Sequence, residues 1–450
     1  MSARRFNYDR APPETSRARL LDRYAIRSIA AVALACAAFA SQARDLTLAE
    51  TEAQFQAHNR ELLAARRTVE AAQAGQLSAA ARPNPTLSLN SVDISRSPGV
   101  GSGPLRDKRI DTTLRIDQPI ERGDKRTLRM DAASHLELAA RDDSLDTLRV
   151  QLAQLRGAYY DLKQAQDKVA ILDETAQLYA RTLAAAQARL KAGDIAAADA
   201  AKVELDYDRA QNDALAARAE RTRNALALGY MIGGDVDAAS LRAVDPWPAE
   251  RPDPAAVESA IDSYVDARPD VLAAKARVVA ADKLRDLARS QRTRDVTLGA
   301  QIEHYPGTMP ENSIGIGVSV PLFTGNDFSG DIQRAEVERY AALDALQKAR
   351  AVAGDEIRRA ASDLGAAAAR LQRYDTTLLG AAVRSAQAAE FAFRRGASSV
   401  LDVLDARRTL RAVQLEALAA RVDYAKALAA WHASLAGADA LSTEQAEEHR

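Results

Sequence analysis

Two aspartates with helical spacing are the residues of this sequence most able to do chemistry. Asp402 and Asp405 lie three positions apart in the segment RRGASSVLDVLDARRTL, shortly after Gly396. That spacing places both carboxylates on one face of a helix. They could bind a metal cation, act as a catalytic acid and base, or simply belong to a solvated helix face.

The sequence supplies few partners for catalysis or for a bound metal. A general acid–base pair needs a histidine or a cleft, and no histidine lies near the two aspartates in sequence. The five histidines occur singly: His58, His135, His304, His432 and His449. No nucleophile motif, phosphate-binding loop or metal-ligand spacing is found. We therefore predict no enzyme, no cofactor and no resident metal.

Composition points to long helices rather than to a compact mixed fold. The 450 residues include 61 Lys+Arg and 62 Asp+Glu, so the charges cancel and nothing favours nucleic-acid binding. Aromatic residues make up 5%, while alanine, leucine, arginine and glutamine are abundant. After residue 43 no apolar stretch is long enough to predict a membrane-spanning helix.

The amino-terminal segment has the pattern of an export signal. Arg17, Arg19, Arg23 and Arg27 precede the apolar run SIAAVALACAAFA, which ends in small residues. We interpret residues 1–43 as a signal peptide with a basic extension, cleaved after Ala40 or Ala43.

Cys36 is the only cysteine, so an internal disulfide is impossible. It lies inside the predicted signal, and its alternative role is lipidation. Ala33 stands where a lipidation motif usually has leucine, and both readings stay open.

The chain is internally duplicated. Pro119 and Pro321 lie 321 − 119 = 202 residues apart, and Gly193 and Gly396 lie 396 − 193 = 203 apart. A period this long indicates two halves of one architecture rather than a solenoid. We expect a first repeat over 44–232, a connector rich in Pro, Asp and Gly over 233–256, a second repeat over 257–437, and a disordered polar tail over 438–450.

Each repeat is predicted to contain a helical hairpin. Apolar residues recur at alternating steps of three and four, the pattern of a coiled coil. In the last helix this apolar stripe includes Val403 and Ala406. We expect a leading helix in each repeat, long helices over 124–192 and 327–395, and return helices over 195–232 and 398–436. The glycine turns close the hairpins, and a long helix of this size spans about 100 Å.

Two β-hairpins, over 86–118 and 295–322, precede the long helices. Apolar and polar residues alternate in strands long enough to cross a bilayer when tilted. Four strands are too few to close a barrel, and an open sheet in lipid leaves unsatisfied edges. A trimer with twelve strands would remove every edge. The alternative is a soluble sheet covered by the helices.

Four segments carry a resemblance to a known family. They are LTLAETEAQFQAHNRELLAA, AAARPNPTLSL, QPIERGDKRTLR and GASSVLDVLDARRTL. In this order they resemble the TolC-type outer-membrane efflux proteins, from about Leu46 to Gly437. QPIERGDKR resembles most the heavy-metal subgroup of CzcC and CusC type. One departure is His58-Asn59-Arg60, where the family commonly has Asn-Pro.

The resemblance implies a mainly α-helical, internally duplicated TolC-like fold with a small β part. Three chains would form a homotrimer with a twelve-stranded barrel in the outer membrane of a Gram-negative cell and a coiled-coil helical tunnel in the periplasm. Such ducts catalyse nothing. They are the passive exit of a tripartite efflux pump, joined by a periplasmic adaptor, or membrane fusion protein, to an RND-type inner-membrane transporter.

The resemblance also assigns roles to residues. Asp402 and Asp405 match the pore constriction, where three chains would bring six carboxylates around one lumen and attract cations. The equivalent positions of the first repeat hold Asp199 and Lys202, so the second hairpin should dominate this constriction. The adaptor-docking tips correspond to Arg189, Leu190, Gly193 and Asp194 in the first hairpin and to Arg395, Gly396, Ala397 and Ser398 in the second.

The cargo is less well specified than the architecture. The subgroup motif favours heavy-metal cations, either zinc, cobalt and cadmium or copper and silver. Export of drugs or of proteins by the same architecture is the alternative. A different class, a periplasmic coiled-coil scaffold or adaptor, would carry one hairpin with lipoyl-like and β-barrel modules rather than two hairpins in a duplicated frame.

Overall fold

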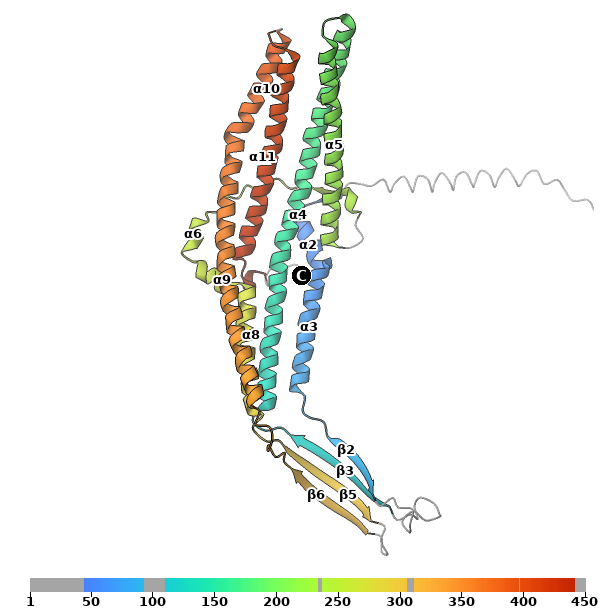
Figure 1. Cartoon of the computed structure of the whole chain (residues 1–450), viewed down its shortest axis with the longest axis vertical. Helices are drawn as coiled ribbons and strands as arrows, with labels where there is room; N and C mark the ends of the chain where they lie inside the picture. Colours follow the sequence, from blue (N-terminus) through green and yellow to red (C-terminus); the bar gives the residue numbers. More distant parts are fainter. Residues whose placement is uncertain (1–43, 93–109, 234–236, 306–310, 396, 442–450) are drawn as a thin grey trace, which may run out of the picture.

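The protein is a bundle of long helices with a small sheet at one end (Figure 1). The computed structural model describes residues 44–92, 110–233, 237–305, 311–395 and 397–441. The predicted export signal and Cys36 lie outside these described residues. The helices run along the long axis of the molecule, and the sheet bends away from that axis (Figure 1).

The first repeat is built around one very long helix. This helix, α4 (Lys125–Ala192), packs against α3 (Arg60–Ala80) towards the sheet and against α5 (Ala197–Ile232) at the far end (Figure 1). The leading helix, predicted as one, is divided into α2 (Leu48–His58) and α3. Asn59 lies between them in an extended conformation, so the chain does not continue as one helix.

The second repeat has the same order of elements with one interruption. It contains α8 (Pro269–Ser290), α9 (Ser329–Arg373), α10 (Leu379–Arg394) and α11 (Val400–Leu435). The prediction of one unbroken helix over 327–395 is wrong, because a π-helical turn over Tyr374–Leu378 separates α9 from α10. Within this turn the Thr376 hydroxyl donates to the Gln372 carbonyl at 2.8 Å and so competes for a backbone acceptor.

Each repeat contributes two neighbouring strands to one antiparallel sheet. The strands are β2 (Thr86–Val92), β3 (Asp111–Ile120), β5 (Val296–Tyr305) and β6 (Glu311–Ser319), in the order β2-β3-β5-β6. Pairing of β3 with β5 joins the repeats, with Leu114 opposite Ile302 and Ile116 opposite Ala300. Among the described residues, β2 and β6 each have one edge without a partner strand.

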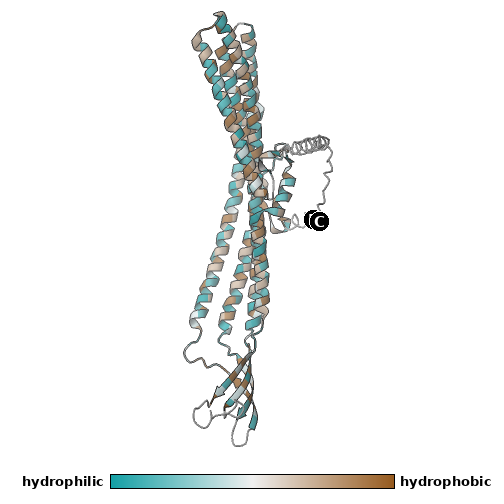
Figure 2. Ribbon diagram, turned by 90° about the vertical axis from the view of Figure 1, so that its right-hand side faces the viewer, coloured by the Kyte–Doolittle hydropathy of each residue, from teal (hydrophilic) through white to brown (hydrophobic). Residues whose placement is uncertain are grey.

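One face of the sheet is apolar and open to the surroundings. Ile314 and Ile316 on β6 are 83% and 93% exposed, and Leu87 and Leu89 on β2 are 68% and 69% exposed. The opposite face carries serine, threonine, glycine and charged residues, because side chains alternate between the two faces of a strand. Among the residues that the structure describes, no helix covers either face of this sheet (Figures 1 and 2).

The connector between the repeats is more ordered than the sequence predicted. Its strand β4 (Leu241–Ala243) pairs in parallel with β1 (Arg44–Leu46), which begins the described chain. The Tyr159 hydroxyl of α4 donates a hydrogen bond to this pair at the Leu46 carbonyl, 3.0 Å away. A 3-10 turn (Ala238–Ser240) precedes β4, and α6 (Ala255–Glu258) and α7 (Ile261–Ala267) follow it.

The predicted disordered tail is wrong at its start. Residues 438–441 are helical, and Ala438 and Leu441 are only 9% and 4% exposed. Leu441 packs into the same apolar core as Leu46 and Leu241. Burial of these apolar side chains outweighs the polar composition that suggested disorder. The rest of the tail lies outside the described residues.

The long helices are amphipathic along their whole length. Hydrophilic and hydrophobic residues are interspersed along the long helices (Figure 2). Within the described part of the chain, no helix is both long enough and apolar enough to cross a membrane.

Candidate gate and docking sites

The first carboxylate of the aspartate pair is part of a helix cap. Ser399 is the N-cap of α11, and its hydroxyl oxygen accepts from the Asp402 backbone N–H at 3.2 Å. The Asp402 carboxylate in turn accepts from the Ser399 backbone N–H at 2.8 Å and from its hydroxyl at 2.9 Å. These bonds, that of the backbone N–H foremost, lower the pKa of Asp402. The Ser-x-x-Asp spacing is a signal for this capping box that the sequence analysis missed.

The second carboxylate is exposed and has no such engagement. Among the described residues, no hydrogen bond or ion pair joins Asp405, and its side chain lies on the surface of α11. Leu404, between the two aspartates, is only 3% exposed and packs with Tyr179 and Val203 of the first hairpin, which consists of α4 and α5.

The buried stripe of α11 differs from the predicted one near the tip. Val403 and Ala406 are only partly buried, whereas Leu404 is buried. The reason is that α11 packs against α10 and also against the first hairpin, so its contact surface is wider than a single coiled-coil stripe.

Ion pairs join the second hairpin, which consists of α9, α10 and α11, to the first. Arg408 of α11 pairs with Asp206 of α5, whose side chain is only 7% exposed. One helical turn further along α11, Arg411 pairs with Asp213 at 3.1 Å. The hydrogen bond to Asp206 raises the pKa of Arg408. These contacts hold the two hairpins side by side near their tips.

The first repeat lacks an equivalent pair of carboxylates. Asp199 and Lys202 occupy the matching positions, and the Lys202 ammonium lies 3.4 Å from the Asp199 carboxylate. The two charges on this turn of α5 therefore offset one another. At these matching positions, only the second hairpin carries two carboxylates.

The tip of the first hairpin is a tight glycine turn. Gly193 has a φ of 82°, a left-handed conformation that favours glycine. Its N–H donates to the Leu190 carbonyl at 3.0 Å, and the Asp194 N–H donates to the Arg189 carbonyl at 2.9 Å. This is a Schellman motif. The side chains of Arg189, Leu190 and Asp194 are exposed.

The tip of the second hairpin lies at the same end of the molecule, opposite the sheet (Figure 1). Gly396 itself lies outside the described residues. The Ala397 N–H donates to the Ala392 carbonyl at 2.9 Å, and the Ser398 hydroxyl reaches the Ala389 carbonyl at 3.4 Å. The Arg395 guanidinium lies 5.3 Å from the centre of the exposed Phe391 ring.

Halfway along the molecule, equivalent residues of the two repeats join stacked helices. Asn59 and Arg268 lie 268 − 59 = 209 residues apart, and they are the N-caps of α3 and α8. The Asn59 side-chain oxygen accepts from the Glu61 N–H at 3.0 Å, and its amide donates to the Met231 carbonyl of α5 at 2.9 Å. Asn59 thereby connects the end of α5 to the start of α3.

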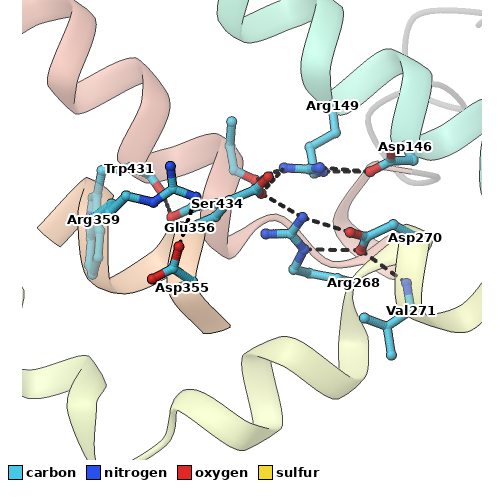
Figure 3. A network of polar contacts seen from close by, with 11 residues as sticks. Asp146, Arg149, Arg268, Asp270, Val271, Asp355, Glu356, Arg359, Trp431 and Ser434 are labelled. Atoms are coloured by element: carbon cyan, nitrogen blue, oxygen red, sulfur yellow. Dashed lines mark hydrogen bonds and ion pairs between the residues drawn. The ribbon is translucent and has the colours of Figure 1, made fainter. Parts of the chain in front are cut away.

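Arg268 makes a wider connection through charge (Figure 3). Its fully buried guanidinium binds Asp270 and Glu356, each at 2.8 Å. Glu356 of α9 also lies 4.0 Å from Arg149 of α4, which pairs with Asp146 at 2.8 Å. This network, which the sequence analysis missed, links α4, α8 and α9. Burial raises the pKa of Asp146.

The described part of the chain contains no dedicated metal-binding site. No group of three or more histidine, cysteine, aspartate or glutamate side chains is placed to hold a metal ion there. A divalent cation usually takes four or more protein and water ligands.

The comparisons with known proteins agree with this architecture. The family model described as "Outer membrane efflux protein" matches residues 53–234 and 260–437. This chain belongs to that family, whose members are passive channels and not enzymes. It is an outer-membrane efflux channel with a periplasmic helical tunnel, so the alternative of a periplasmic scaffold or adaptor is dropped.

Relatives support the family assignment. The chain is 26% identical over 356 residues to the cobalt-zinc-cadmium resistance protein CzcC of Cupriavidus metallidurans, covering 78% of this chain and 81% of the relative. The structure of CusC superposes with a TM-score of 0.68 at 18% identity, covering 87% of this chain and 92% of that one. VceC of Vibrio cholerae gives a TM-score of 0.71 at 20% identity, covering 87% and 96%. These structural similarities show the fold alone.

Proposed function

We propose that three copies of this chain form one duct through which a tripartite pump expels heavy-metal cations. Each chain has four strands, and 3 × 4 = 12 strands would close a barrel and pair the free edges of β2 and β6. The exposed apolar face of the sheet supports insertion in lipid, because such a face in water is an aggregation hazard.

The partners follow from the family and from the shape of the tips. Channels of this family work with a periplasmic adaptor and an inner-membrane transporter. In this proposal the adaptor docks on the two tips, around Gly193 in the first hairpin and Ala397 in the second. In this proposal the transporter is of the RND type and supplies the energy for transport.

The cargo assignment rests on one observation, the similarity to CzcC over 81% of that protein's length. CzcC is named for resistance to cobalt, zinc and cadmium. The same transport would suit copper and silver, and the other members of the family leave drug or protein export as the alternative.

Deleting the gene in its host and measuring growth tests the cargo. We expect lower tolerance of zinc, cobalt and cadmium or of copper and silver, restored by a plasmid copy. A copy without residues 1–43, which we expect to stay in the cytoplasm, is the expression control. Unchanged metal tolerance together with greater drug sensitivity would assign the duct to drug export instead.

The gate is the second part of the proposal. Three chains would place 3 × 2 = 6 carboxylates, from Asp402 and Asp405, around the lumen near the periplasmic end. A ring of carboxylates in a pore attracts cations. Asp405 is exposed and, within the described part of the chain, makes no hydrogen bond or ion pair, which supports this role more directly than the capping position of Asp402 does.

Single-channel recording in planar bilayers tests the gate. Asp402→Ala combined with Asp405→Ala should raise conductance and weaken block by divalent cations. Asp405→Asn alone should produce most of this effect, and Asp199→Asn in the first hairpin is the matched control. An unaltered cation response in the double variant would place these residues away from the lumen.

A further inference from the structure

The polar face of the sheet carries one basic side chain among several acidic ones. Arg115 is the only lysine or arginine in the described strands β2, β3, β5 and β6. Register places Arg115 on the same face as Gln301, because these residues lie directly opposite each other. Four carboxylates share this face: Asp111, Asp117, Glu303 and Glu311.

The guanidinium of Arg115 is fixed along the sheet and does not project from it. Its Nε lies 2.7 Å and 2.9 Å from the two carboxylate oxygens of Asp117, and its Nη1 donates to Gln301 Oε1 at 3.1 Å. Arg115 and Asp117 belong to β3, whereas Gln301 belongs to β5. The side chain therefore crosses from one repeat to the other and is 33% exposed.

Glycine makes room for this arrangement. Gly299 of β5 lies opposite Asp117, and a Cβ at Gly299 would stand 2.5 Å from Arg115 Nη2 and 2.5 Å from Asp117 Oδ1. Next to it on β6, a Cβ at Gly317 would stand at an ordinary 3.4 Å from Arg115 Nη2. A side chain at Gly299, but not one at Gly317, would force the guanidinium off the sheet.

We propose that Arg115, held by Asp117 and Gln301 over Gly299, sets the ion selectivity of the barrel lumen. This inference rests on the proposed trimeric barrel, in which the polar face of each sheet lines the lumen. There, three arginines would offset part of the acidic charge of the wall while leaving the pore wide. A cation has to enter such a pore without binding so strongly that it cannot leave.

Charge variants in planar bilayers give the first test, using the zero-current potential in a KCl gradient and block by Zn²⁺. Arg115→Gln should shift this potential towards cation selectivity and strengthen the block, because the carboxylates lose their counter-charge. Asp117→Asn should shift it towards anion selectivity. If Arg115 only ties β3 to β5, both variants would lower the thermal stability of the oligomer and leave the zero-current potential unchanged, which would overturn the proposal.

Geometry variants give the second test, and its two single alanine variants change no formal charge. Gly299→Ala should lower the single-channel conductance by moving the guanidinium into the lumen. Gly317→Ala is the matched control and should conduct like the wild type. Gly299→Ala combined with Arg115→Gln should recover the lost conductance. Equal conductance of the two alanine variants would contradict the proposal, and if Gly299→Ala fails to insert, the charge variants decide.

This outcome can be separated from that of the proposed function. A wild-type protein that forms no channels and no trimers would refute the duct itself. A wild-type protein that forms channels, with selectivity indifferent to Arg115 and Asp117, would refute only the inference about the barrel lumen.

Discussion

Asp402 and Asp405 have identical side chains on one turn of α11, yet their carboxylates meet different surroundings. Asp402 accepts two hydrogen bonds from Ser399 and closes the cap of the helix. Asp405, three residues further on, is exposed. A residue at the start of a helix has unpaired backbone N–H groups beside it, and one turn later those groups are paired within the helix. Asp402 therefore closes the start of the helix, whereas Asp405 is exposed and takes no part in the cap.

Replacing Asp402 should loosen the start of α11 in a pH-dependent manner. Because the cap lowers the pKa of Asp402 below its ordinary 3.8, its stabilising contribution is present above that value and is lost as pH falls through the folded-state pKa. Hydrogen exchange measured by mass spectrometry should show faster exchange at 399–403 in Asp402→Ala near neutral pH. After correction for intrinsic rates, this difference should disappear in acid.

Asp405→Ala is the control for this measurement, because Asp405 takes no part in the cap. Equal exchange of wild type and Asp402→Ala near neutral pH would show that the capping box does not hold the tip.

At the scale of elements, the two repeats use different chemistry to join their stacked helices halfway along the molecule. Asn59 connects α5 and α3 through neutral hydrogen bonds, whereas Arg268 connects α8, α9 and α4 through buried charge. Removing one partner from a buried ionic network leaves the other charges uncompensated, which costs far more than losing an exposed pair. We therefore expect the second repeat to depend on a single side chain at mid-length.

Arg268→Met should destabilise the protein by about 2 kcal/mol, because the partly exposed carboxylates of Asp270 and Glu356 would lose charge-assisted hydrogen bonds from their buried partner. Arg359→Met is the matched control, since the Arg359–Asp355 pair shown in the same region (Figure 3) has side chains 65% and 64% exposed. Thermal unfolding in detergent, followed by circular dichroism at 222 nm as a helix signal, measures both. Similar losses in the two variants would mean that burial does not set the importance of Arg268.

Local patterns in the sequence predict most of these elements, and long-range contacts explain what they miss. The heptad pattern placed a long helix at 124–192, and α4 spans Lys125–Ala192, because that pattern reflects contacts repeated at every turn. The mainly helical fold with a small sheet is confirmed.

Three features depended on partners far away in sequence. Strand β1 is three residues long and is defined only by β4, about 200 positions later. Leu441 is ordered by the core around Tyr159, and Arg268 gains its role only when α9 and α4 surround it. At the candidate gate, the sequence indicated two carboxylates on one face. The sequence analysis did not distinguish the roles of Asp402 and Asp405, because the cap that engages Asp402 depends on where the helix begins.

At the scale of the whole molecule, the surface at the sheet end differs from the surface at the hairpin tips. The hairpin tips expose charged residues such as Arg189 and Arg395 beside single apolar ones, whereas the sheet has a continuous open apolar face. Alternation along the strands keeps charge on the opposite face, so a register shift of one residue would exchange the two faces. Insertion in the outer membrane should therefore tolerate charge on one face of β6 and not on the other.

Ile316→Lys should block membrane insertion, because a lysine on the lipid face near the bilayer centre costs about 3 kcal/mol in each chain. Ser313→Lys, on the opposite face of the same strand, is the matched control and should insert. Fractionation after a high-salt wash of the membranes measures insertion directly. Recovery of Ile316→Lys in the outer membrane at the wild-type level would contradict the assignment of the two faces.

The short parallel pair of β1 and β4 has a consequence for how the chain can be tethered. It fixes Arg44 beside Leu241, ahead of α2 and at the far end of α3 from the sheet (Figure 1). Cys36 precedes Arg44 by 44 − 36 = 8 residues, and eight residues reach at most about 28 Å when fully extended. Helix α3 alone has 21 residues, a length of about 31 Å. A fatty acid on Cys36 would therefore fall short of a bilayer placed around the sheet, so in the proposed barrel the strands themselves would anchor the protein.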